Sequence, residues 1–122
     1  MSDQSSDPVM EQLREQISET DLAILEAINR RVTLVQRLHT YKAEQGYDLI
    51  DTAREDWIVQ YLQRCNRGPI TPDEVATVSR FLLDLTRRET VRLRGDVETE
   101  IQGFREFLEN VRPEDFGGPS SS

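Results

Sequence analysis

The chain has 122 residues, of which 36% are hydrophobic, and its formal net charge is −8. A chain of this length forms a single domain at most, with a core of modest size. The acidic balance argues against nucleic acid as a ligand, because a phosphate backbone binds to a basic face. One cysteine cannot form an internal disulfide, and no apolar run approaches the roughly 18 residues of a membrane span. We therefore expect a cytoplasmic protein that neither crosses a membrane nor carries a signal segment.

The first predicted element is a helix over residues 8–45. Asp7 followed by Pro8 is typical of an N-cap and a first helical position, and Gly46 can adopt the left-handed conformation that ends a helix. Between these ends, apolar residues recur at three- or four-residue steps: Leu13, Ile17, Ile24, Ile28, Val32, Val35 and Leu38. At about 1.5 Å per residue this helix is roughly 55 Å long. A small core cannot cover such a stripe, so we expect a second copy of the chain to pack against it.

A second, shorter helix is predicted from Thr52 to about Asn66. Thr52 and Glu55, three residues later, form the pattern of a capping box. Apolar and aromatic residues then follow at helical spacing: Trp57, Ile58, Tyr61 and Leu62. The turn-forming residues 67–69 end the element.

The third helix has the clearest start in the chain, because Thr71 is a good N-cap, Pro72 suits the first position and Glu74 completes a capping box. Its apolar pattern continues to about residue 93. The acidic segment 96–109 keeps helical spacing as well. We expect this segment to form either an added helix or an extension of the third one.

These elements predict an all-α fold of three helices, long, short and long, with an extra C-terminal helical segment. Residues 1–7 are small and polar and should form a disordered arm. The helical domain spans residues 8–94, and the helical extension spans residues 95–111. Residues 112–122 are rich in Pro, Gly and Ser, and we expect a disordered tail there.

Three cations interrupt the polar and apolar pattern of the first helix. At about 100° per residue, Arg31 and Lys42 lie within about 20° of each other and about 16 Å apart along the axis, so their long side chains could close on one small anion. Arg14 lies roughly 25 Å from Arg31 and about 100° round the helix. Such a helix would present Arg14 to a second copy of the protein rather than to its own site.

A polar patch is predicted where the second helix begins. Asp51, Arg54 and Glu55 stand at i, i+3 and i+4, so an arginine, a carboxylate and free backbone N–H groups share a small area. This patch suits a ligand that carries both a carboxylate and a hydroxyl group. The alternative is purely structural: Arg54 forms a surface pair with a neighbouring acid, and Glu55 is only the capping partner of Thr52.

Several of these features together resemble the all-helical, type II class of chorismate mutases. They are the segment Leu13-Arg14-Glu15-Gln16-Ile17, Asp21, the Arg30-Arg31 pair, Lys42 and the Asp51-x-x-Arg54-Glu55 turn. The resemblance covers about residues 9–92. It implies an intertwined homodimer in which two long helices cross. It also implies an isomerase that converts chorismate to prephenate in the shikimate pathway of aromatic amino-acid biosynthesis.

The resemblance also implies a role for each matching residue. The partner subunit's Arg14 and the chain's own Arg31 would bind the two carboxylates of chorismate. Lys42 would contact the ether oxygen and a carboxylate, and Arg54 would close the carboxylate side. Asp51, through its backbone, and Glu55 would bind the ring hydroxyl, with apolar walls from Leu38 and Leu83.

On the third helix the chain departs from the family pattern. Thr86 falls where the family has a small hydroxyl residue, but Thr90 falls where it commonly has Gln or Glu, the second donor to the breaking ether bond. A threonine is too short to reach as a glutamine does. Glu89 could substitute only with a shifted helix register and a protonated carboxyl group. The neighbouring arginines read most simply as a solvated basic face: Arg87, Arg88, Arg92 and Arg94.

The implied reaction is a one-substrate pericyclic rearrangement, which needs no nucleophile, metal or cofactor. The site has to hold the enolpyruvyl arm over the ring and to place cations where negative charge grows on the ether oxygen. Three alternatives stay open. They are a sister enzyme on the same scaffold (an isochorismate pyruvate lyase or a 4-amino-4-deoxychorismate mutase), a regulatory mutase module that depends on a shikimate-pathway enzyme as partner, and a dimeric helical scaffold without a ligand.

Overall fold

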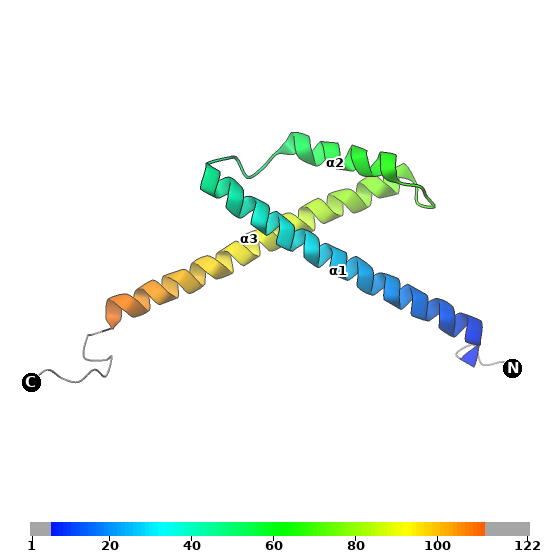
Figure 1. The fold of residues 1–122 in the computed structure, drawn as a ribbon, viewed down its shortest axis with the longest axis horizontal. Coiled ribbons are helices and arrows are strands. Elements are labelled where there is room, and N and C mark those ends of the chain that lie inside the picture. The colour runs from blue at the N-terminus through cyan, green and yellow to red at the C-terminus, as the bar shows by residue number, and fades with distance from the viewer. Residues whose placement is uncertain (1–5, 112–122) are drawn as a thin grey trace, which may run out of the picture. The chain divides into compact units, whose positions relative to one another are not determined.

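The computed structural model describes residues 6–111. The described residues form three α-helices and no strand: α1 (Pro8–Gln45), α2 (Thr52–Cys65) and α3 (Pro72–Asn110), shown in Figure 1. The predicted all-α fold with a long, a short and a long helix is confirmed. The expected arm and tail fall, apart from Ser6 and Asp7, outside the described residues. The chain divides into two compact units, Met1–Arg87 and Arg88–Ser122.

Helix α1 begins and ends where its capping residues predict. The carboxylate of Asp7 accepts hydrogen bonds from the backbone N–H groups of Val9 (2.9 Å) and Met10 (3.3 Å). These bonds satisfy two of the amide groups that a helix N-terminus leaves without partners. At the other end Gly46 has a φ of 74°, and its N–H donates to the carbonyl of Ala43. A residue without a Cβ adopts this conformation at little cost.

The cap of α2 corrects the sequence prediction by one residue. Asp51, and not Thr52, is the N-cap: its Oδ1 accepts the N–H of Arg54 at 3.0 Å, and Thr52 is the first helical residue. An aspartate caps at least as well as a threonine, and its charge is favourable at the positive end of the helix dipole. Glu55 is therefore not the partner in a capping box. Its carboxylate forms an ion pair with Arg87 of α3 instead.

Helix α3 starts as predicted and continues through the acidic segment 96–109. The hydroxyl of Thr71 accepts the N–H of Glu74 at 3.2 Å, and Pro72 is the first helical residue. The helix passes through Gly95 without a break and ends at Asn110. A glycine inside a helix costs about 1 kcal/mol relative to alanine, which is not enough to stop a helix whose flanking residues favour it. The acidic segment is thus an extension of the third helix.

In the unit Met1–Arg87, α2 lies beside the first turns of α3, and α1 crosses α3 further along, where Arg31 contacts Leu82 and Thr86 (Figure 1). The buried apolar residues of this unit are few and small: Val59, Val75 and Ala76. Helix α1, whose residues are all described, contains no buried residue. Many of its large apolar side chains are at least 53% exposed: Leu13, Ile17, Leu22, Ile24, Leu25 and Leu34.

The described part of the second unit is the continuation of α3 to Asn110, followed by Val111. Arg92 forms ion pairs with Glu89 (2.8 Å) and Asp96 (2.9 Å) along the helix, and the hydrogen bond that Arg92 donates to Glu89 raises the pKa of Arg92. Large apolar side chains on this segment are exposed: Ile101, Phe104, Phe107 and Leu108. No helix in the described part of the chain combines the length and the hydropathy that crossing a bilayer requires.

Candidate active site

A small pocket lies where α1 crosses α3 and where α2 begins. Its volume is about 90 Å³. The polar residues on its wall are Arg31, His39, Glu55, Thr86 and Arg87, and the apolar lining residues are Val35, Leu49, Ile50 and Leu83. The expected apolar wall at Leu83 is therefore present, whereas Leu38 is 49% exposed and does not line this pocket.

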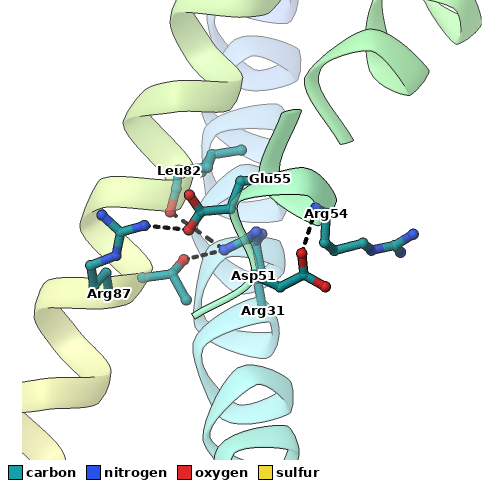
Figure 2. A network of polar contacts seen from close by, with 7 residues as sticks. Arg31, Asp51, Arg54, Glu55, Leu82 and Arg87 are labelled. Carbon is teal, nitrogen blue, oxygen red and sulfur yellow. Dashed lines mark hydrogen bonds and ion pairs between the residues drawn. The ribbon is translucent and has the colours of Figure 1, made fainter. Parts of the chain in front are cut away.

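Arg31 is the cation at the centre of the pocket. Its Nη1 donates to the hydroxyl of Thr86 at 2.5 Å and to the backbone carbonyl of Leu82 at 3.4 Å, so two groups of α3 fix the guanidinium (Figure 2). The side chain is half-buried. Burial lowers the pKa of Arg31, because the charged form loses hydration, and the carboxylate of Glu55 acts in the opposite direction. Arg31 is thus a positioned, partly desolvated cation.

The Glu55 carboxylate lies between two guanidinium groups. Arg87 donates from Nη2 to Oε1 of Glu55, while Arg31 interacts with the same carboxylate electrostatically (Figure 2). Arg87 is exposed, as a solvated basic face predicts, but it is also paired with Glu55 and lines the pocket, which sequence reasoning missed. Glu55 and Arg87 are 32 positions apart. No local pattern could have paired them.

The other two residues of the α2 patch have local roles in this structure. Asp51 caps the helix, as described above, and is exposed. The guanidinium of Arg54 lies over the ring of Trp57, with Cζ 4.0 Å from the ring centroid. Figure 2 shows the Arg54 side chain pointing away from Arg31 and Glu55. The structure therefore brings Glu55, but not Arg54, to the other site residues.

The two remaining cations of α1 lie away from the pocket. Because α1 is one continuous helix, Arg14 lies about 25 Å from Arg31 along its axis, at about 1.5 Å per residue. Arg14 is exposed. Lys42 is half-buried in the last turn of α1, about 16 Å along the helix from Arg31, and is not among the pocket-lining residues.

The two threonines of α3 are among its most buried residues. Thr86 is 2% exposed and Thr90, which follows it by four positions along α3, is 3% exposed. Glu89 is half-buried, and its carboxylate accepts a hydrogen bond from Nε of Arg92. A carboxylate engaged in this way is an acceptor rather than a protonated donor. Thr90 is therefore buried, whereas the Glu89 side chain is engaged with Arg92 on the helix surface.

The chain matches a family model over most of its length. The model of the family described as chorismate mutase type II matches residues 13–91. The chain belongs to the chorismate mutase type II family. The match contains every site residue named above, from Arg14 to Thr90, and stops before the exposed apolar side chains of the extension.

Solved structures of chorismate mutases share the fold. Forms I and II of the chorismate mutase from Thermus thermophilus are each 23% identical to this chain, with TM-scores of 0.61 and 0.64. They cover 63% and 68% of this chain, and the matches span 96% and 94% of their own chains. Among curated proteins, no match was found.

Membership of the type II family makes the chain an isomerase, a chorismate mutase, and the substrate implied by the family is chorismate. Neither comparison favours the two sister activities that the sequence left open. The solved structures, at this level of identity, support the fold alone.

Proposed function

We propose that the chain catalyses the rearrangement of chorismate to prephenate as a homodimer, with each site centred on Arg31. The observation that carries this proposal is the half-buried guanidinium of Arg31, fixed on Thr86 in a pocket that also contains a carboxylate. A cation held in place before the substrate arrives needs little reorganisation when it binds an anion. Chorismate carries two carboxylates, an ether oxygen and a ring hydroxyl, and the pocket offers complementary groups.

In this proposal the anionic end of chorismate is bound by arginines of both chains. Arg31 binds one carboxylate through the N–H groups that are not directed to Thr86. The partner subunit's Arg14 binds the other. Lys42 donates to the ether oxygen, where negative charge grows as the carbon–oxygen bond breaks and the new carbon–carbon bond forms. The arginines hold the enolpyruvyl arm over the ring, and Lys42 stabilises the developing charge.

The ring end of chorismate is assigned to α2 and α3. Glu55 accepts a hydrogen bond from the ring hydroxyl, assisted by the backbone of Asp51. Arg54 closes the carboxylate side, which requires its guanidinium to leave the face of Trp57. That contact is worth about 0.5–1 kcal/mol at an exposed site, a small cost against a charge-assisted hydrogen bond to a carboxylate. Thr86 and Thr90 supply hydroxyl groups on α3.

Two observations support the homodimer. The apolar stripe of α1 is exposed along its length, and large exposed apolar surfaces on a single chain are typical of interfaces. The pocket of about 90 Å³ is far below the 300–1,000 Å³ that is typical of small-molecule sites, which agrees with a site completed by a second chain. A long α1 then carries Arg14 to the neighbouring site.

A dependence on a larger pathway enzyme is the second candidate. The observation that favours it is the exposed apolar group on the extension, Ile101, Phe104, Phe107 and Leu108, outside the family match. A shikimate-pathway enzyme that contacts this face would raise a weak solo activity. Full activity of the chain by itself would rule out this dependence. A cytoplasmic location belongs to the proposal too, and the free, exposed thiol of Cys65 is compatible with a reducing compartment.

The experiment that tests the function is an assay of the purified chain with three substrates in parallel: chorismate, isochorismate and 4-amino-4-deoxychorismate. We expect consumption of chorismate with prephenate as the product. The Arg31→Ala variant, with its folding checked by circular dichroism, serves as the control and should be inactive. Pyruvate released from isochorismate, or conversion of the amino substrate in preference to chorismate, would contradict the proposal.

A further inference from the structure

The ion pair between Arg87 and Glu55 lies inside the pocket but is not part of the family motif that the sequence displays. Arg87 donates from α3 to Oε1 of Glu55 on α2, and both side chains line the same pocket as Arg31 (Figure 2). The Glu55 carboxylate thus faces two guanidinium groups on different helices.

Arg31 and Arg87 have different tasks toward an anion. Nη1 of Arg31 is directed to Thr86 and to the Leu82 carbonyl, which leaves Nη2 and Nε as the nitrogens that can turn toward a substrate. If the Glu55 carboxylate moved onto those nitrogens, it would compete with a substrate carboxylate for the same donors. This competition would be strongest if Glu55 and Arg31 formed two parallel hydrogen bonds, because such arginine–carboxylate pairs are especially strong. The pair with Arg87 opposes that movement.

We propose that Arg87 is a positioning residue of this site: by binding Oε1 of Glu55 from α3, it keeps the carboxylate away from Arg31, so that Arg31 stays available for the substrate. The inference rests on the proposed function, since it concerns binding of an anionic substrate at Arg31. Bound in this way, Glu55 presents its second oxygen, Oε2, to the ring hydroxyl. Arg87 acts through Glu55 and is not assigned a contact with the reacting atoms.

A purely structural role fits the pair less well. The side chains of Arg87 and Glu55 are 47% and 31% exposed, and an ion pair exposed to this extent contributes little to the stability of a fold. The pair also fills no core, because the buried apolar residues of this unit lie elsewhere: Val59 follows Glu55 on α2, and Val75 and Ala76 precede Arg87 on α3. The effect of removing Arg87 should therefore appear in substrate binding rather than in folding.

The test measures kcat and KM for chorismate in five variants: Arg87→Met, Arg87→Lys, Glu55→Gln, the double variant Glu55→Gln/Arg87→Met, and Arg80→Met. Arg80 is the matched control, since it is exposed on the same helix, outside the pocket, and its loss changes the net charge equally. Circular dichroism and thermal unfolding monitor the fold of each variant.

We expect Arg87→Met to raise KM roughly tenfold, with kcat within about threefold of wild type, as loss of a charge-assisted hydrogen bond predicts. Arg87→Lys, which keeps the charge, should recover most of the affinity, and Arg80→Met should behave as wild type. In the Glu55→Gln background, which removes the competing charge, Arg87→Met should change KM by less than about twofold, because the two residues act as a unit.

Three outcomes would overturn the inference. They are an unchanged KM in Arg87→Met, an equal KM increase in Arg80→Met, and a full additional loss from Arg87→Met in the Glu55→Gln background, which would mean that Arg87 contacts the substrate directly. Failure of the proposed function gives a different result. In that case the wild-type chain does not convert chorismate to prephenate, whereas failure of this inference alone leaves an active wild type.

Discussion

Arg31 on α1 donates to the hydroxyl of Thr86 on α3 across 2.5 Å, and this bond joins the centre of the pocket to a residue that is 2% exposed. The hydroxyl does more than hold a rotamer. Arg31 is half-buried and its pKa is lowered by desolvation, so each hydrogen bond to its guanidinium offsets part of the cost of keeping a charge there. The pair therefore contributes to the stability of the fold and also holds the Arg31 guanidinium in place in the pocket.

Thr86→Val tests this link. Valine matches threonine in shape but removes the acceptor at Arg31, and a partly buried charged donor that loses its partner costs about 1–3 kcal/mol in the free energy of unfolding. We expect a loss of this size in urea unfolding at fixed protein concentration, together with a higher KM for chorismate. Thr77→Val is the control, because the exposed Thr77 hydroxyl bonds only within its own helix, to the Asp73 carbonyl, in the contacts described for it. Equal stability of the two variants would contradict the assigned role.

The homodimer makes a prediction about folding itself. Since α1 has no buried residue in one chain, the proposed second chain would cover most of its apolar stripe, and folding should depend on that contact. We expect sedimentation to show a dimer, and we expect the midpoint of thermal unfolding to rise with protein concentration. Ile17→Lys, which charges the stripe, should abolish the dimer, whereas Glu15→Lys on the exposed polar side should preserve it. A well-folded monomer at micromolar concentration would refute the proposal.

Mixing of inactive variants tests whether Arg14 serves the neighbouring site. Arg14→Ala and Arg31→Ala should each abolish activity, yet the two proteins refolded together should recover part of it. A heterodimer of these chains has one site with both defects and one site with neither. Each variant refolded alone is the control and should stay inactive. Verified heterodimers without any activity would place Arg14 in its own chain's site or outside the site altogether.

The helices were predictable because their ends depend on neighbouring residues. Asp7, Gly46 and Thr71 each fix a helix end through bonds that reach no further than four positions. The one error in capping, at α2, arose because Asp51 and Thr52 are adjacent and both can cap. The choice between them also decides whether Glu55 turns back to its own helix or across to α3. The sequence near Glu55 does not contain its partner on α3, Arg87.

The site was predictable only in part, and for the same reason. Arg31 could be identified from its place on the first helix, and Thr86 from the family pattern. Arg87 could not, because its partner lies 32 positions away and the pairing depends on how α2 and α3 pack. Arg54 shows a signal that was overlooked: Trp57 follows it by three positions, the spacing at which side chains on one helix face meet, and the two stack in the structure.

Lys42 should be the most important single side chain for the rate. If Thr90 occupies the position where the family has a longer donor, the ether oxygen depends mainly on Lys42 for stabilisation. Lys42→Ala should then raise the barrier by about 3 kcal/mol or more, comparable to the loss of an oxyanion-hole donor. The measurement is kcat/KM for chorismate, with Arg37→Ala, an exposed cation on the same helix, as the control. An increase in the barrier well below about 3 kcal/mol would contradict this role of Lys42.

Thr90→Gln decides whether the threonine occupies the second-donor position. A glutamine there restores a longer amide donor toward the ether oxygen, so the variant should be neutral or faster than wild type.

Were Glu89 the donor, it would have to be protonated, and wild-type activity would fall as rising pH removes that proton. Its carboxylate accepts a hydrogen bond from Arg92, which argues against a donor role toward the ether oxygen. We therefore expect a flat pH–rate curve for wild type and no damage from Glu89→Gln. A Thr90→Gln enzyme that loses most of its activity would exclude the Thr90 assignment, and a wild-type decline that Glu89→Gln flattens would establish Glu89 as the donor.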